Sequence, residues 1–278
     1  MSSSLFSVYQ WLLWLGCWTF IAIAIAETVA AQDSPWRLVW SDEFEGTTLN
    51  YSKWGVDVNA FGGGNDELQL YTDRRENVRV EQGSLVLEAH ADRPTILGTT
   101  RDYSSGKIRS KHRGDWTYGR FEVRAQLPPG QGIWPAIWML PTDETYGAWA
   151  ASGEIDIAEF KGQEPDRVHG TVHFGGVWPD HQSATQDYQL PQGSFVDGFH
   201  TFAFEWEPNQ MRWYVDGHLF YKLDKWHTSG QPFPAPFDKA FHLLLNLAVG
   251  GRFVGLPDDS TVFPQQLRVD YVRVYQRK

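Results

Sequence analysis

Three carboxylates stand close together in the stretch GEIDIAEF (153–160), among β-branched and aromatic residues that are typical of a buried strand. Because side chains alternate between the two faces of a strand, Glu154 and Asp156 would lie on one face and Glu159 on the other. One extra residue, a β-bulge at Ile157-Ala158, would turn Glu159 onto the face of the other two acids. We therefore predict a bulged strand that lines a groove with all three carboxylates.

Two carboxylates about 5–6 Å apart are typical of retaining glycosidases, in which one attacks the anomeric carbon and the other acts as acid and then as base. Glu154 and Glu159 could reach this separation if their side chains lean together on a concave sheet. Asp156 between them could orient the nucleophile, and its charge would help to keep the acid protonated. The alternative for any single acid is a solvent-facing place on an ordinary strand, but three in this pattern favour catalysis.

The preceding strand, GQGIWPAIWMLP, places Trp134 and Trp138 four residues apart, on the same face of an unbulged strand. Aromatic faces suit sugars, because the axial C–H groups stack on the π system while the hydroxyl groups form hydrogen bonds at the rim. One such Trp alone is more often part of a hydrophobic core. Beside the strand that carries the acids, we predict that both bind sugar.

Short runs rich in Val, Ile, Phe, Tyr and Trp, separated by Gly, Pro, Asn and Asp clusters, must position these side chains. The run YGRFEVRAQL (118–127) alternates between apolar and polar residues, and Asp216-Gly217 in MRWYVDGHLFYKL indicates a hairpin. Because no stretch keeps a 3.6-residue period, we predict an all-β sandwich or barrel of antiparallel strands. We find no internal repeat or linker, so we expect one domain over residues 32–278.

The composition argues against several classes of function. The formal net charge is −10 at pH 7, whereas nucleic-acid partners and anionic membranes select clustered Lys and Arg. The glycine-rich FGGGNDEL lacks the Gly-Lys-Ser/Thr of a phosphate loop. His169 and His173 are four apart in a strand rather than on a helix, which is weak evidence for a metal site. We expect no catalytic cofactor and no nucleic-acid partner.

The first 31 residues differ from the rest of the chain. Residues 11–26 carry no charge but are fewer than the about 20 residues of a membrane span. Small residues at 29–31 offer a cleavage site, so we expect residues 1–31 to be a signal peptide and the mature protein to be secreted or periplasmic, with no stable membrane partner. The first ten residues lack Lys and Arg, which leaves an uncleaved anchor as the alternative. Cys17 is the only cysteine, so the mature protein would hold no disulfide.

The acid motif and its surroundings resemble glycoside hydrolase family 16. GEIDIAEF matches the ExDxxE signature of this family, in the bulged form of its laminarinases. Further blocks resemble family segments in the same order, from about Trp36 to Gln276: WSDEFEG, FGGGNDELQLYT, SGKIRSK, YGRFEVRAQLPPGQGIWPAIWMLP, VHGTVHFGG, DGFHTFAFEWE, NLAVGG and VDYVRVYQ. The resemblance implies a β-jelly-roll of two curved antiparallel sheets with a concave cleft. It also implies a retaining, endo-acting β-1,3-glucanase that hydrolyses laminarin-like β-glucans.

The resemblance also implies roles for single residues. Glu154 corresponds to the nucleophile, Asp156 to the assisting acid and Glu159 to the acid/base. The implied substrate-binding residues are Trp134, Trp138, Asn65, His173 and, more weakly, Arg109. For His173 the alternative is a buried histidine with its hydrogen bonds satisfied. Phe253 stands where family laminarinases often carry Trp, so the resemblance does not extend to that sugar contact on the non-reducing side.

Many members of the family carry a structural calcium ion away from the cleft. The matching positions here are Glu43, Asp270 and Gly83, the last through its backbone oxygen. Two carboxylates and carbonyl oxygens suit a hard cation. Surface ion pairs for both acids are the alternative.

Other functions remain open on the same fold. The substrate could be mixed-linkage glucan, agar or carrageenan, or the reaction a transglycosylation. The unbulged ExDxE form typifies lichenases and xyloglucan enzymes, and sulfated galactans would call for basic residues that are few near the motifs. A non-catalytic glucan-binding protein usually lacks one of the acids, and a purely structural module would neither bind nor cleave. We expect a polysaccharide as the partner and a monomeric protein.

Overall fold

The computed structural model describes residues 34–96 and 98–278, and the predicted signal peptide lies outside the described residues. Residues Leu38–Gln276 form one compact unit, and residues 34–37 with Arg277 and Lys278 are assigned to a second unit. The described residues include no helix that is long and apolar enough to cross a membrane.

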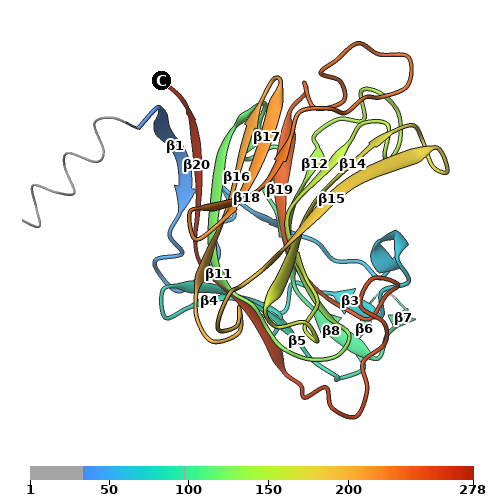
Figure 1. Cartoon of the computed structure of the whole chain (residues 1–278). Helices are drawn as coiled ribbons and strands as arrows, with labels where there is room; N and C mark the ends of the chain where they lie inside the picture. The colour runs from blue at the N-terminus through green and yellow to red at the C-terminus, as the bar shows by residue number, and fades with distance from the viewer. Residues whose placement is uncertain (1–33, 97) are drawn as a thin grey trace, which may run out of the picture. The chain divides into compact units, whose positions relative to one another are not determined.

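Two eight-stranded sheets build the compact unit (Figure 1). Sheet 1 consists of β1 (Trp36–Asp42), β4 (Val78–Glu81), β5 (Ser84–Ala89), β11 (Gly119–Gln126), β16 (His200–Glu207), β17 (Gln210–Val215), β18 (His218–Leu223) and β20 (Gln265–Arg277). Its order is β18-β17-β16-β11-β20-β5-β4, and β1 pairs with β20. The pairs from β4 to β18 are all antiparallel.

Sheet 2 consists of β2 (Gly55–Val56), β9 (Lys107–Arg109), β10 (Asp115–Trp116), β12 (Ile133–Pro141), β13 (Glu154–Phe160), β14 (Arg167–Gly175), β15 (His181–Gln189) and β19 (Phe241–Val249). Its order is β15-β14-β13-β12-β19-β9-β2, with β10 on β19, and its pairs are antiparallel. The smaller elements are the parallel pair β3 (Gln69–Tyr71) and β8 (Tyr103–Ser105), the antiparallel pair β6 (Thr95–Ile96) and β7 (Thr99–Thr100), and the 3₁₀ turn η1 (Gly62–Gly64).

The hydrophobic core lies between the two sheets. In β11 the buried residues alternate with partly exposed ones, so Phe121 and Val123 face inward while their charged neighbours do not. Ile137, Leu243 and Leu245 of sheet 2 belong to the same buried cluster. The predicted fold class, a β-jelly-roll sandwich, is confirmed.

The predicted hairpin joins β17 to β18. Asp216 and Gly217 both have positive φ, 48° and 79°, as a two-residue type I′ turn requires. The turn matches the right-handed twist of the flanking strands, and it sets the register in which β18 closes the edge of sheet 1.

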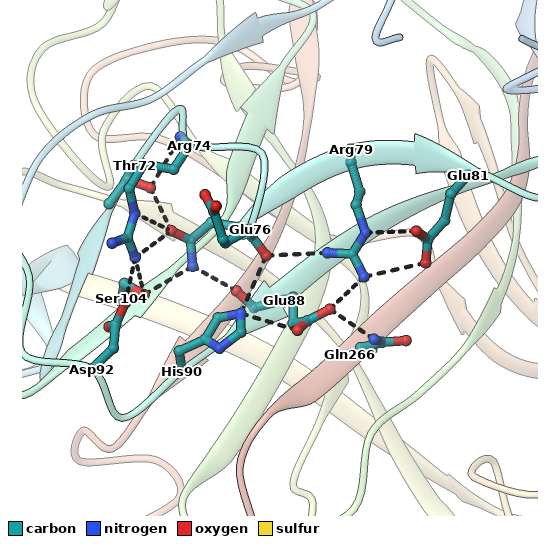
Figure 2. Close-up of polar contacts among 11 residues, drawn as sticks. Thr72, Arg74, Glu76, Arg79, Glu81, Glu88, His90, Asp92, Ser104 and Gln266 are labelled. Carbon is teal, nitrogen blue, oxygen red and sulfur yellow. Dashed lines mark hydrogen bonds and ion pairs between the residues drawn. The ribbon is translucent and has the colours of Figure 1, made fainter. Parts of the chain in front are cut away.

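A polar network fastens the segment after β3 to sheet 1 (Figure 2). The buried Asn77 accepts hydrogen bonds from Thr72 Oγ1 (2.5 Å) and from Arg74 Nε (3.1 Å) and donates one to the backbone carbonyl of Glu88 (2.9 Å). Buried polar groups are tolerated only when they are paired in this way. The network therefore fixes the chain directly after Tyr71, a residue that contributes to the site described next.

Candidate active site

The β-bulge predicted in GEIDIAEF is confirmed. In the pairing of β12 with β13, Ala136 lies opposite Glu159 and Trp138 lies opposite Asp156. Three residue steps in β13 therefore match two in β12, and the pairing with β14 shows the same offset. One residue between Asp156 and Glu159 is therefore extra. It places Glu159 on the same face as Asp156, whereas strict alternation would place it on the opposite face.

The bulge separates the apolar side chains of β13 from the acidic ones. Ile155, Ile157, Ala158 and Phe160 all belong to the buried core cluster, including the two consecutive residues at the bulge. Glu154 and Glu159 are partly exposed, and Asp156, although only 2% exposed, lies with Glu154 beside His173. The strand thus presents its carboxylates on the face that looks away from the core, as predicted.

Two neighbours hold the carboxylate of Glu154. The indole N–H of Trp149 donates a hydrogen bond of 2.8 Å to Oε2. His173, opposite Glu154 in β14, has Nε2 at 3.9 Å from Oε1 of Glu154 and at 3.4 Å from Oδ2 of Asp156. One oxygen atom each of Glu154 and Asp156 and one ring nitrogen of His173 lie within 4.8 Å of one another. The predicted site residue His173 therefore adjoins the nucleophile candidate.

Burial of three carboxylates in one place raises their pKa values. Desolvation raises the pKa of Glu154 and of Asp156 to about 8, and it raises that of Glu159 well above its usual value. The charge of Asp156 is the second cause at both glutamates. At Glu154 the charge of His173 and the Trp149 hydrogen bond oppose the rise. These raised pKa values favour protons on the acids at neutral pH; His173 and Trp149 favour loss of the proton from Glu154, while the larger burden of neighbouring charge favours a proton on Glu159.

We predict that Asp156→Asn stabilises the protein more as the pH rises. The folded-state pKa of Asp156, about 8, exceeds the value of about 3.9 for an unfolded Asp. The protonated carboxyl therefore contributes stability that is complete below about pH 4 and is lost as the pH rises through 8. The neutral amide has no such loss. Thermal unfolding from pH 4 to 9 should show a Tm difference that grows with pH.

The control for this measurement is the exposed Asp259→Asn, which removes the same charge outside the site. Its Tm difference from the wild type should stay constant over the same pH range. A constant difference for Asp156→Asn as well would contradict the buried-acid account.

A row of rings leads from Glu154 to solvent. The ring centroid of Trp149 lies 5.0 Å from that of His181, which in turn lies 4.9 Å from that of Trp178. Trp178 is 61% exposed. Sequence reasoning did not single out Trp149 or Trp178, although Trp149 precedes Glu154 by only five residues.

Trp138 belongs to a polar cluster on the same sheet. Its indole N–H donates to Oδ1 of Asn246 (2.6 Å), and Nδ2 of Asn246 donates to the hydroxyl of Tyr71 (3.0 Å). Nζ of the buried Lys107 lies 4.7 Å from the centroid of a Trp138 ring. Burial lowers the pKa of Lys107, whose charge in turn helps to lower the pKa of Glu154.

Trp134 lies on the same face but is more enclosed. It is 7% exposed, and its ring packs against Phe253 at 5.0 Å between centroids. Its indole N–H has no hydrogen-bond acceptor among the described residues, and it lies near enough to Glu159 to oppose the rise of that pKa. Sugar binding by Trp134 and Trp138 stays a prediction.

Two other predicted sugar contacts lie further from the acids along the chain. Asn65 follows η1, and its backbone carbonyl accepts the N–H of Arg252, which ties this loop to the segment beside Trp134. Arg109 forms an ion pair of 2.9 Å with Asp57. Within SGKIRSK, Lys107 rather than Arg109 contacts Trp138. Lys107 and Arg109 lie on the same face of β9, so the motif alone did not show which of them contacts Trp138.

The three predicted calcium ligands lie in sheet 1 and its loops. Glu43, Gly83 and Asp270 line one surface pocket together with Arg124 and Arg273. Arg273 binds both carboxylate oxygens of Glu43 (3.1 and 2.8 Å), whereas Arg124 binds only Oδ2 of Asp270 (2.5 Å). Both predicted carboxylate ligands are therefore paired with arginine side chains, as in the alternative of surface ion pairs.

Comparisons with known proteins agree with this geometry. Residues 48–273 match the family model described as Glycosyl hydrolases family 16. The "Glucan endo-1,3-beta-glucosidase A1" of Niallia circulans is 46% identical over 260 residues, which are 87% of this chain but 38% of that protein. The "Beta-glucanase" of Rhodothermus marinus is 45% identical over 252 residues, covering 87% of this chain and 85% of that protein. The solved laminarinase from Rhodothermus marinus has a TM-score of 0.76 at 44% identity, covering 87% of this chain and 98% of that one.

Proposed function

The chain belongs to glycosyl hydrolase family 16, and from this premise we propose that it is an endo-acting β-1,3-glucanase that hydrolyses laminarin-like glucans with retention of configuration. The observation that carries the proposal is the bulged strand β13, which brings together three carboxylates, the buried Asp156 and the partly buried Glu154 and Glu159. The names of the two similar enzymes support the substrate class.

In the proposed first step Glu159 donates its proton to the glycosidic oxygen while Glu154 attacks the anomeric carbon. The C–O bond to the leaving sugar breaks, and a covalent glycosyl-enzyme forms. The carboxylate of Glu159 then accepts a proton from water, whose oxygen attacks the same carbon and releases Glu154. Two inversions at one carbon give net retention.

The neighbours of the acids support this division of roles. Trp149 and His173 stabilise the anionic form of Glu154 and orient it, as a nucleophile requires. Asp156 lies between the two glutamates. Desolvation, with a smaller contribution from Asp156 when it is charged, raises the pKa of Glu159 and so favours its protonated form.

A panel of polysaccharides tests the substrate. Laminarin, mixed-linkage glucan, agarose and carrageenan would each be incubated with the protein, and reducing ends and product sizes would be measured. We expect rapid release of oligosaccharides of several lengths from laminarin. Binding of laminarin without new reducing ends would contradict the proposal and favour a glucan-binding protein. Cleavage of only a galactan would overturn the substrate class.

We also propose that the protein is exported and acts as a monomer. The charge-free run at 11–26 followed by small residues supports export. N-terminal sequencing of protein recovered from the culture medium should begin near residue 32. Light scattering should report the mass of one chain.

We further propose a structural calcium ion at Glu43, Gly83 and Asp270. Oxygen donors from these residues line one pocket, and they would hold the ion where the chain after β1 meets β20. We predict that Tm rises when millimolar calcium is added to protein treated with EDTA, because the ion binds only the folded state. Asp270→Asn should abolish the rise. An unchanged wild-type Tm would show that the ion pairs alone occupy this place.

A further inference from the structure

Trp213 links the two sheets at the bulge. It lies in β17 of sheet 1 and has no exposed surface. Its indole N–H donates a hydrogen bond of 2.9 Å to the backbone carbonyl of Asp156 in β13. A side chain from the opposite sheet therefore binds the main chain between two of the three acids.

The bulge creates the need for such a donor. The extra residue interrupts the regular ladder between Asp156 and Glu159, and buried backbone groups near an interruption need other partners. Gly170, in β14, lies opposite the interruption. A Cβ atom at Gly170 would lie 2.7 Å from Cδ1 of Trp213, so the missing side chain makes room for the indole.

The indole is held on its other sides as well. Its ring stacks on Tyr221 with centroids 4.6 Å apart and lies 4.8 Å from the ring of Phe204. All three residues belong to sheet 1. A donor fixed in this way can fix the carbonyl that it binds.

We propose that Trp213 is a positioning residue, whose bond to the Asp156 carbonyl fixes the bulge and thereby the place of Glu159 relative to Glu154. This inference rests on the proposed function, because it assigns Trp213 to the same reaction. Glu154 precedes the bulge and Glu159 follows it, so a displacement at the bulge changes the position of Glu159 relative to Glu154. A misplacement of 1 Å can lower a rate by about 100-fold.

Trp213→Phe tests the proposal, because it removes the N–H group and keeps an aromatic ring. Trp206→Phe is a matched control. Trp206 is also fully buried in sheet 1 and donates to a backbone carbonyl, that of Phe237 (3.1 Å), which lies outside β13. Both variants should lose stability, and only the first should lose catalysis per folded molecule.

The measurement compares kcat and KM on laminarin with those on a dinitrophenyl β-1,3-glucoside, whose leaving group needs no protonation. For Trp213→Phe we expect kcat on laminarin to fall by about 10- to 100-fold, with KM nearly unchanged. The loss on the dinitrophenyl substrate should be much smaller, because the displaced group is the acid. A merely structural role would lower both rates equally, and Trp206→Phe should change neither.

A wild-type kcat for folded Trp213→Phe, or equal losses on the two substrates, would overturn the inference. If Trp213→Phe does not fold, Gly170→Ala replaces it, since the new Cβ must displace the indole. This variant should show the same selective loss on laminarin, and wild-type kcat would again overturn the inference. If instead the wild type does not cleave laminarin, the proposed function itself fails.

Discussion

Glu154→Ala is expected to lower kcat on laminarin by about 10⁵-fold while the protein stays folded, because removing a catalytic nucleophile has effects of this order. The variant removes the carboxylate that accepts the hydrogen bond of Trp149 and lies beside His173. Initial rates of reducing-end release, with circular dichroism as a check on folding, measure the effect.

Added azide separates this role from simple damage. In Glu154→Ala the small anion can attack the anomeric carbon from the vacated side, while Glu159 still protonates the leaving group. We expect azide to restore part of the rate and to give a glycosyl azide of inverted configuration. Glu164→Ala, which removes a partly buried glutamate four residues after the strand, should keep the wild-type rate. Near-normal hydrolysis by Glu154→Ala would contradict its assignment.

Glu159→Ala is expected to lower kcat on laminarin by about 10³- to 10⁴-fold, because general acid catalysis contributes 10²–10⁴. A dinitrophenyl glycoside should form the glycosyl-enzyme at nearly the normal rate, since its leaving group needs no proton. Azide should then give a product of retained configuration. Equal losses on the two substrates would contradict the role of Glu159 as the acid.

The pH profile gives an independent measurement of the same residue. Burial and the charge of Asp156 raise the pKa of Glu159 in the wild type. The wild-type kcat/KM should therefore fall on the alkaline side, where Glu159 loses its proton. In Glu159→Ala this alkaline limb should disappear when the dinitrophenyl substrate is used. Persistence of the limb would show that it belongs to another group.

The fold and the bulge could be predicted from local patterns. Alternation in β11 follows from burial of one face, and the turn at Asp216-Gly217 follows from the backbone that a two-residue hairpin requires. Strict alternation in β13 would put Glu159 on the opposite face from Glu154 and Asp156. One extra residue puts all three on one face, and this mismatch predicted the bulge. These features depend on neighbours in the sequence, so the sequence suffices.

Strand β15 was not predicted, for a physical reason. Its sequence, HQSATQDYQ, has few apolar residues, and all nine of its side chains are partly or fully exposed in this edge strand. Hydrogen-bonded pairing with β14 along its whole length stabilises β15, rather than burial of its side chains. Composition therefore gave no periodic signal at this edge.

The long-range contacts of the site were also beyond the sequence. Trp213 reads as an ordinary core residue of its hairpin, and its bond to Asp156 joins residues 57 positions apart. Lys107 is buried and lies over Trp138, whereas Arg109, on the same strand face, is exposed and pairs with Asp57. Such contacts depend on the pairing of strands that are distant in the chain, so local sequence patterns do not predict them.

The configuration of the first product tests the central claim most directly. Proton NMR during the first minutes of laminarin hydrolysis distinguishes the two anomers of the new reducing end before they interconvert. If Glu154 forms a glycosyl-enzyme and Glu159 activates the water, the β anomer appears first and the α anomer follows by mutarotation. Initial appearance of the α anomer would mean a single displacement by water, and it would contradict the assignment of Glu154 as the nucleophile.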